Sequence, residues 1–447
     1  MATVNVQELI DSRRLSRFQV LVVSLCALVV LLDGFDTQAI GYVAPAIVRS
    51  WHVNRAALTP VFSAGLFGLM IGALAFGPVA DRVGRKPVLV FCTLFFGMMA
   101  LLTLTADSVR SLTTLRFVTG LGLGGAMPNA IALTTEYAPR RIRATTVMIM
   151  FCGFSLGAAL GGVAAAYLIA HFGWKAVFVV GGIAPCFLLP FLVALLPESI
   201  RYLVVQGGNG ERVASILHRI DAVAVVPADA SFTVEEHRTG GFVVRQLFAE
   251  GRGAFTLLVW VVFFMSLLDL YFLTSWLPTI VHDAGIAETS AVLITAMYQA
   301  GGIAGALLLG QLFDRFSPFL MLALTYVAAS AFVLLIGVAG VSLTPLVLTV
   351  FGAGFCVVGG QIGANALTAN SYPTPIRSTG VGWALGIGRI GSIVGPAVGG
   401  LLLSLRWPMR QIFLVGAVPL LIAALASSLV FLLRRSPRAE QAVATVP

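Results

Sequence analysis

Long apolar runs separated by short polar stretches make up most of the chain. An α-helix of about 20 residues crosses the ~30 Å hydrocarbon core of a bilayer, so each run is long enough to span a membrane. We expect twelve spanning helices, at residues 18–47, 57–79, 88–106, 112–134, 144–170, 174–196, 255–280, 290–312, 318–338, 343–369, 380–404 and 410–433. The pattern predicts an all-α integral membrane protein.

Composition agrees with this prediction and excludes a soluble domain. Hydrophobic residues make up 58% of the chain and charged residues only 11%, whereas soluble domains carry about 25% charged residues. The five cysteines fall in five different apolar runs, without CxxC spacing or a histidine cluster. We therefore expect no metal site, no cofactor and no disulfide framework.

The positive charges predict the orientation in the membrane. Most Lys and Arg residues fall in the two tails and in the even-numbered connections between the predicted helices, and few fall in the odd-numbered ones. Short cytoplasmic loops retain positive charge, so both termini are expected in the cytoplasm of a bacterial inner-membrane protein. The net charge of +9 then reflects this topology and contact with anionic lipid, rather than binding to nucleic acid.

The two halves of the chain repeat each other at an offset of about 233 residues. The matched pairs are Asp36 with Asp269, Pro45 with Pro278, Asp81 with Asp314 and Arg82 with Arg315. A duplicated six-helix unit explains them. We expect an N-terminal half at residues 1–200, a charged cytoplasmic linker at 201–253 and a C-terminal half with a cytoplasmic tail at 254–447.

The connection between the second and third predicted helices carries the segment GPVADRVGRKP, which begins at Gly77. Gly77 favours close helix contact, an acid at this place can bind a cation of a neighbouring helix, and the basic residues bind the anionic leaflet. The gating residues expected here are Gly77, Asp81, Arg82, Gly84, Arg85 and Lys86, with Asp314, Arg315 and Arg377 as second-half counterparts. The alternative is a plain positively charged loop.

Two carboxylates lie inside the first apolar run. Asp33 and Asp36 are three residues apart and so share one helical face. An ionised group at bilayer depth costs at least ~3 kcal/mol, so acids of this kind usually face a polar partner or handle ions and protons. We expect the pair to bind and release a proton.

The loop motif resembles that of the major facilitator superfamily, and the segment LDGFDTQAIGYVAP from Leu32 to Pro45 resembles the signature of its aromatic acid/proton symporter family. The resemblance implies a major facilitator fold with twelve transmembrane helices in two six-helix halves. It also implies a monomer that imports aromatic carboxylates, such as 4-hydroxybenzoate or protocatechuate, with protons by alternating access. Arg116 is similar to a fourth-helix motif, Glu136 sits where the family keeps an acid, and Arg389 falls where it carries a charged residue.

These residues predict a site that binds the substrate and couples its transport to protons. An aromatic carboxylate needs a cation, for which Arg389 is the first candidate and Arg116 the second. Proton coupling is assigned to Asp33, Asp36, Arg116 and Glu136. The other expected substrate-binding residues are Asp269, Phe35, Tyr42, Tyr271, Trp276, Tyr298, Gln299, Gln361, Asn365 and Trp383.

Several alternatives stay open. Asp36 can form a permanent pair with Arg116, and Arg389 can form a helix-packing ion pair with Asp269. An exporter of drugs or sugars on the same scaffold and a membrane receptor for aromatic acids are the alternative functions. An enzyme is not expected, because no nucleophile with a base, metal cluster or phosphate loop is found.

Overall fold

The computed structural model describes residues 3–207, 209–221, 231–233, 243–249, 251–340, 342–372 and 377–435. Within these ranges the side chains of Asp314 and Arg377, both expected in loop motifs, lie outside the described part. Much of the linker expected at 201–253 also lies outside it.

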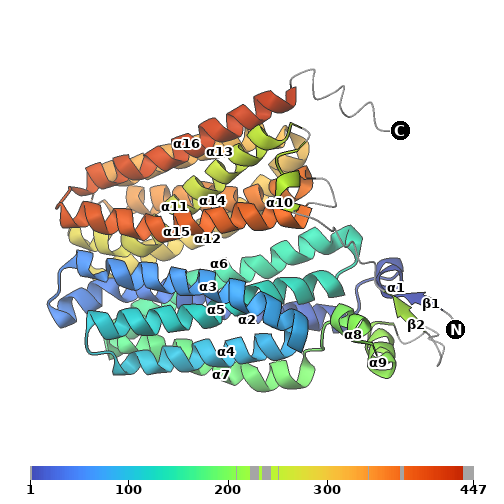
Figure 1. Ribbon diagram of the computed structural model, residues 1–447. Coiled ribbons are helices and arrows are strands. Elements are labelled where there is room, and N and C mark those ends of the chain that lie inside the picture. Colours follow the sequence, from blue (N-terminus) through green and yellow to red (C-terminus); the bar gives the residue numbers. More distant parts are fainter. Residues whose placement is uncertain are drawn as a thin grey trace. The chain divides into compact units, whose positions relative to one another are not determined.

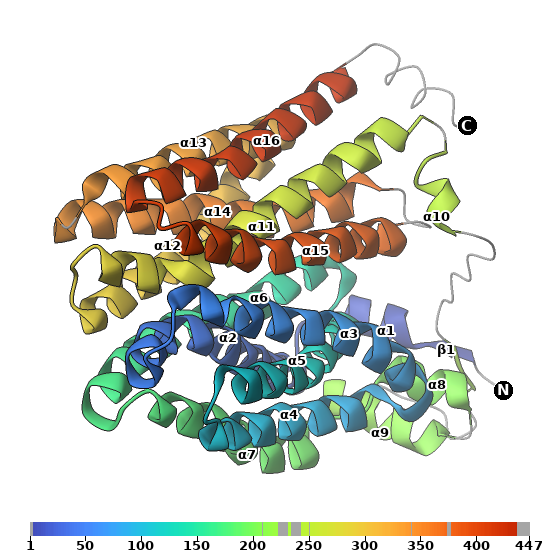
Figure 2. The ribbon, with the colours of Figure 1, turned by 60° about the vertical axis from the view of Figure 1, so that its left-hand side comes forward.

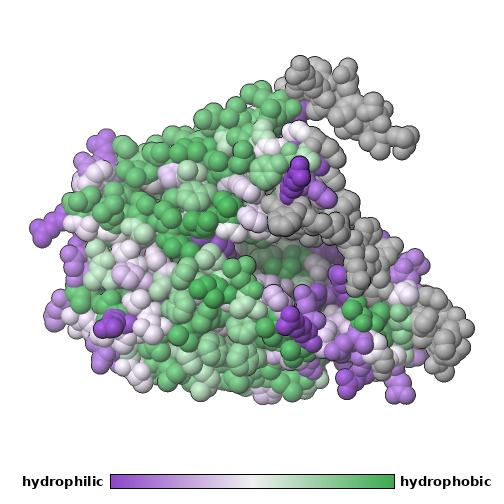
Figure 3. Space-filling view, in the orientation of Figure 1, coloured by the Kyte–Doolittle hydropathy of each residue, from purple (hydrophilic) through white to green (hydrophobic). Residues whose placement is uncertain are grey.

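Twelve long helices make up most of the described part of the chain, and all twelve are long and apolar enough to cross a membrane. They are α2 (Arg17–Trp51), α3 (Thr59–Val83), α4 (Arg85–Leu102), α5 (Val109–Tyr137), α6 (Arg143–Phe172), α7 (Lys175–Leu195), α11 (Gly253–Asp283), α12 (Glu288–Arg315), α13 (Pro318–Ala339), α14 (Leu343–Ser371), α15 (Arg377–Ser404) and α16 (Met409–Arg435) (Figures 1 and 2). The predicted spans are confirmed, with ends that differ by a few residues. Apolar side chains cover the middle of the helices and polar ones gather near their ends (Figure 3).

Short elements complete the described part. They are β1 (Thr3–Asn5), α1 (Val6–Ser12), α8 (Ile200–Gln206), α9 (Gly210–Ile220), β2 (Ser231–Thr233) and α10 (Val243–Gln246), with single 3-10 turns at Arg55–Leu58, Thr103–Thr105 and Arg140–Ile142. Strand β1 pairs in parallel with β2. Helix α9 buries Val213, Ile216, Leu217 and Ile220, which share one face at the i, i+3, i+4, i+7 spacing.

The chain divides into two compact units. Unit 1 comprises Met1–Ala39, Ala64–Ala158 and Lys175–His237, and unit 2 comprises Ile40–Ser63, Ala159–Trp174 and Arg238–Pro447. The boundaries expected at residues 200 and 253 stay a prediction.

Glycines bring helix backbones into close contact inside each unit. In unit 1 a methyl group added at Gly157 of α6 would overlap the carbonyl oxygen of Leu31 in α2. In unit 2 one added at Gly391 of α15 would overlap the carbonyl oxygen of Phe264 in α11. Close packing between small residues drives helix association in lipid, where burial of apolar surface supplies little.

Candidate functional site

A buried ion pair joins α2 and α5 in unit 1. Arg116 of α5 donates from Nη1 to Asp36 Oδ1 at 3.2 Å and from Nη2 to Asp36 Oδ2 at 2.9 Å. Nη2 also reaches the backbone carbonyl of Asp36 at 3.1 Å. The two side chains are 3% and 1% exposed. The bidentate geometry is the strongest form of an arginine–carboxylate pair, and it matches the pairing left open as an alternative.

The second acid of the first helix lies one turn away. Asp33 is buried and accepts a hydrogen bond from the Thr37 hydroxyl at 3.0 Å. Gly34, between the acids, faces α6, because a methyl group there would overlap the carbonyl oxygen of Phe154. Phe35 lies against Gly181 of α7. The segment therefore holds two carboxylates, Asp33 and Asp36, in a tightly packed helix.

The loop motif and the end of α5 form a second polar cluster in unit 1, which we call the loop-motif cluster: Gly84, Arg85, Glu136, Glu198 and Ser199. Arg85 forms an ion pair with Glu136, and Glu136 also accepts a hydrogen bond from the Ser199 hydroxyl at 2.6 Å. Glu136, expected in proton coupling, thus pairs with a gating residue. Its coupling role stays a prediction.

Glu198 caps helix α4 from another part of the chain. Its Oε1 accepts hydrogen bonds from the backbone N–H groups of Arg85 at 2.9 Å and Lys86 at 3.1 Å. A carboxylate is favoured here because the first N–H groups of a helix have no intrahelical partner. The preceding residue, Gly84, has φ of 107° and no side-chain cap of its own. A side chain at Gly84 would overlap the Glu198 carboxylate, so the loop requires glycine here.

The other described contacts of the loop motif are single hydrogen bonds. The carbonyl oxygen of Arg82 accepts a hydrogen bond from Tyr202 at 3.1 Å, and Lys86 Nζ donates to the carbonyl of Val193 at 2.8 Å. At Gly77 an added methyl group would meet no described atom within 4 Å, so the close helix contact expected there is not found.

In unit 2, the arginine expected to bind substrate lies beside a tyrosine. Arg389 of α15 is half-buried and donates from Nη1 to the hydroxyl of Tyr271 in α11 at 3.2 Å. Asp269 is fully buried, and neither of its oxygens accepts a hydrogen bond from a described group. The ion pair between Asp269 and Arg389, left open as an alternative, is absent among the described residues.

The aromatic and amide candidates in unit 2 have different surroundings. Trp276 is fully buried and donates from Nε1 to the carbonyl of Pro396 at 2.8 Å, a packing contact between α11 and α15. Trp383 is 43% exposed and stacks on Trp260 at 5.7 Å. Tyr42, Tyr298 and Gln299 are buried. In α14, Gln361 Nε2 donates to Asn365 Oδ1 at 3.2 Å, while Gln361 Oε1 is buried without a partner.

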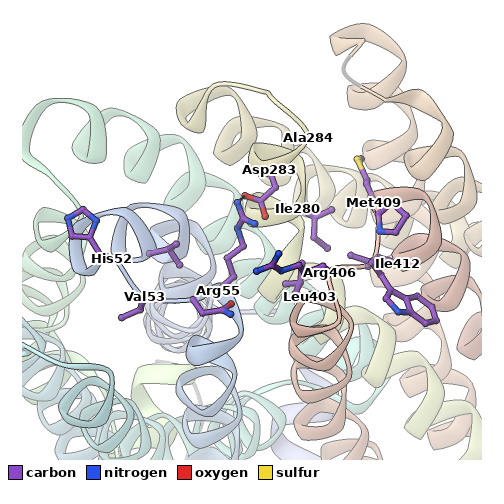
Figure 4. A pocket seen from close by; sticks show the side chains of 14 residues that line it. His52, Val53, Arg55, Ile280, Asp283, Ala284, Leu403, Arg406, Met409 and Ile412 are labelled. Atoms are coloured by element: carbon purple, nitrogen blue, oxygen red, sulfur yellow. Dashed lines mark ion pairs between the residues drawn. The ribbon is translucent and has the colours of Figure 1, made fainter.

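A cavity of about 770 Å³ lies in unit 2 at one end of α11, α15 and α16. Arg55, Asp283 and Arg406 are its charged lining residues, and Arg55 pairs with Asp283 (Figure 4). His52 and Arg406, which also line it, have left-handed backbones with φ of 53° and 55°. None of the residues predicted to bind substrate lines this cavity.

Sequence reasoning missed the capping role of Glu198 and the pairing of Arg85 with Glu136. Both contacts join residues more than 50 positions apart in the chain, so residue spacing carries no signal for them. Among the described residues, no group of three or more His, Cys, Asp or Glu side chains is placed to hold a metal ion.

Comparison with known proteins identifies the family. The chain is 44% identical to the 4-hydroxybenzoate transporter PcaK of Pseudomonas aeruginosa, over 96% of this chain and 95% of that protein. It is 41% identical to a gallate transporter of Pseudomonas putida, over 95% and 94%. The solved structure of the xylose transporter XylE from E. coli, in a partially occluded inward open conformation, superposes with a TM-score of 0.70 at 17% identity, covering 94% of this chain and 97% of that one.

These relatives are named as transporters, so the expectation of a transporter rather than an enzyme is confirmed. The expected fold is confirmed too, because twelve candidate spans and the likeness to XylE agree with it. Residues 26–358 and 259–446 match the family description of the Major Facilitator Superfamily, and the chain is a multi-pass membrane protein that belongs to this superfamily.

Proposed function

We propose that this protein imports aromatic carboxylates such as 4-hydroxybenzoate or protocatechuate, together with protons, across the bacterial inner membrane by alternating access. The observation that carries the proposal is the 44% identity, over nearly the full length of both chains, to a protein named as a 4-hydroxybenzoate transporter. A second relative is named for gallate, which is also a hydroxylated benzoate. A hydroxybenzoate is therefore the substrate class to test first.

The carboxylate is assigned to Arg389. Its guanidinium has five N–H donors, and the described contacts use one nitrogen, on the Tyr271 hydroxyl. The remaining donors can form a bidentate pair with a carboxylate, the geometry that arginine favours. Arg116, the second candidate, already binds Asp36. Tyr271 adds an aromatic ring next to the cation, and a ring edge suits contact with a benzoate.

The proton is assigned to the first helix. Protonation of Asp36 would neutralise its carboxylate and leave Arg116 as a buried cation without its counterion. That state is costly, and so it is stable only when helices move or an anion approaches. Entry of a carboxylate substrate is thereby linked to entry of a proton. Asp33, one turn away, is the second acid able to exchange the proton.

The orientation follows from the charges. The tails and the junction of α3 with α4, where Arg82, Arg85 and Lys86 lie, belong in the cytoplasm under the positive-inside rule. The loop-motif cluster then lies at the cytoplasmic end of unit 1, where its ion pair would break and re-form as the transporter changes state.

The experiment is uptake of radiolabelled 4-hydroxybenzoate into cells that produce this protein, with and without a protonophore. Unlabelled aromatic acids and sugars serve as competitors, and cells with the Asp36→Asn variant serve as a control at equal membrane level. Uptake that the protonophore abolishes and that only aromatic acids compete with supports the proposal. No uptake by correctly inserted protein, or net efflux, contradicts it.

A further inference from the structure

The two halves repeat not only in sequence but in helix contacts. In the first half a methyl group at Gly120 of α5 would overlap the carbonyl oxygen of Gly65 in α3. In the second half one at Gly354 of α14 would overlap the carbonyl oxygen of Tyr298 in α12. The α3 and α12 positions differ by 233 residues and the α5 and α14 positions by 234, close to the offset of about 233 in the sequence repeat. The contacts therefore define which residues correspond.

This correspondence places Val350 where the first half has Arg116, and Tyr298 where it has Gly65. In the first half, the absence of a side chain at Gly65 leaves room beside Arg116, whose carbonyl oxygen would lie 3.6 Å from an added methyl group. In the second half Val350 and Tyr298 are both fully buried. The second half thus keeps the acid, Asp269, but replaces its cation with an apolar side chain and a phenol.

Asp269 occupies the same surroundings as Asp36 in one further respect. A methyl group at Gly416 of α16 would lie 3.7 Å from Asp269 Oδ1, and one at Gly181 of α7 would lie 3.9 Å from Asp36 Oδ1. The two acids differ in their partners. Asp36 binds Arg116 through both oxygens, whereas both oxygens of Asp269 are buried without a described hydrogen-bond partner.

The described groups around Asp269 offer it no counterion. On α12, the Tyr298 hydroxyl is buried without a partner and lies within electrostatic reach of Asp269. On α15, Arg389 donates to Tyr271 instead. Gly416 of α16 lies near Asp269, with Val333 of α13 next to it, and Val350 of α14 is the counterpart of Arg116. None of these carries a positive charge.

A buried carboxylate without a counterion is disfavoured so strongly that the group binds a proton instead. We propose that Asp269 and Tyr298 form a proton-binding site in the second half, in which the Asp269 carboxyl is neutral and releases its proton when movement of α11 admits water. The site goes beyond the proposed function, which uses the acids of the first helix. The role of this site in transport rests on the proposed function, whereas the protonation of Asp269 does not.

Infrared spectroscopy of the purified protein in detergent tests protonation without any substrate. At pH 7 the wild-type protein is expected to show a carbonyl stretching band of a protonated carboxylic acid that Asp269→Asn lacks. The matched variant Asp36→Asn keeps the band, because both oxygens of Asp36 accept hydrogen bonds from the Arg116 cation. Tyr298→Phe, which removes only the hydroxyl, shifts the band. Identical spectra of wild type and Asp269→Asn at pH 7 would overturn the proposal.

Stability gives a second test that does not depend on assigning the band. Asparagine is a close replacement for a neutral carboxyl, so Asp269→Asn should melt near the wild-type temperature, whereas Asp36→Asn loses an ion pair and should melt lower. The double variant Val350→Arg with Tyr298→Gly copies the first half and should abolish the band by ionising Asp269. An Asp269→Asn protein that fails to fold while Asp36→Asn folds contradicts a neutral Asp269.

Transport separates the two proposals. In proteoliposomes, Asp269→Asn is expected to lose at least tenfold in uptake driven by a pH gradient, while exchange of labelled for unlabelled 4-hydroxybenzoate continues. Wild-type gradient-driven uptake by the variant overturns the transport role of the site. If the wild-type protein itself moves no aromatic acid, the proposed function fails, and the spectroscopic result still decides whether Asp269 holds a proton.

Discussion

Arg116 and Asp36 form a bidentate ion pair, with Nη2 2.9 Å from Oδ2 and Nη1 3.2 Å from Oδ1, that is almost fully buried. The desolvation cost of two buried charges offsets much of their attraction, so such a pair adds little net stability as a whole. Removal of one partner is different, because it leaves a buried charge without a counterion. The pair is therefore suited to respond to a single proton.

We predict that Asp36→Ala and Arg116→Ala each lower the free energy of unfolding by about 3–5 kcal/mol, while the double variant loses much less than the sum. Denaturant titration of the purified protein in mixed micelles measures both. Arg410→Ala is the control, because Arg410 is exposed at the start of α16, and it should stay within about 0.5 kcal/mol of wild type. Additive losses would show that the pair does not act as a unit.

The contact between α2 and α6 gives a prediction with a matched control. A methyl group at Gly34 would overlap the carbonyl oxygen of Phe154, whereas one at Gly77 would meet no described atom within 4 Å. Gly34→Ala should lower stability by about 1–3 kcal/mol through overpacking. Gly77→Ala should be neutral or gain up to about 1 kcal/mol, because alanine favours the helix. Thermal unfolding in detergent compares them, and equal effects would contradict the close contact.

The cap of helix α4 by Glu198 predicts an effect at a distance in sequence. Glu198→Ala removes the acceptor of the Arg85 and Lys86 backbone N–H groups, and loss of a helix cap costs about 0.5–2 kcal/mol. Glu211→Ala, at the exposed start of α9, is the control and should stay within about 0.5 kcal/mol of wild type. Hydrogen exchange at the first turn of α4 should rise in Glu198→Ala alone; unchanged protection there would rule out the capping role.

The twelve helices could be predicted from sequence because each depends on a local property, an apolar run of sufficient length. The short helix α9 could also have been found, since Val213, Ile216, Leu217 and Ile220 follow a helical spacing. It was not predicted because it is short and lies in a charged segment. Close helix contacts are found at Gly157 and Gly391, but the contact expected at Gly77 is not, because a glycine in a sequence does not reveal what faces it.

The site was less predictable than the fold. The sequence identified Asp36, Arg116 and Glu136 as candidate functional residues. It did not establish the partner of each, because the partners depend on how the helices pack. Arg85 pairs with Glu136, 51 residues away, and only the folded chain reveals this. An ion pair of Asp269 with Arg389 was one alternative, and the structure instead leaves both Asp269 oxygens without a described hydrogen-bond partner. The position equivalent to Arg116 is Val350, an apolar residue that no motif would single out.

Arg389 and Tyr271 give the prediction closest to substrate recognition. Arg389→Gln keeps a polar side chain but removes the charge, so it loses a charge-assisted hydrogen-bond pair worth about 1.5–3 kcal/mol, which corresponds to a roughly 10- to 100-fold higher KM for 4-hydroxybenzoate. Arg389→Lys keeps the charge but loses the planar fork and should fall between. Tyr271→Phe, which removes the hydroxyl that accepts from Arg389, should have a smaller effect on KM.

Initial rates of uptake over a range of 4-hydroxybenzoate concentrations, at matched membrane levels, measure KM and the maximal rate separately. Arg410→Gln is the control, because Arg410 is an exposed arginine at the start of α16, and it should leave both unchanged. If Arg389→Gln lowers the maximal rate with KM unchanged, Arg389 serves the conformational change instead of the substrate. If both arginine variants behave as wild type, the substrate carboxylate binds elsewhere, and Arg116, released from Asp36, becomes the cation to test.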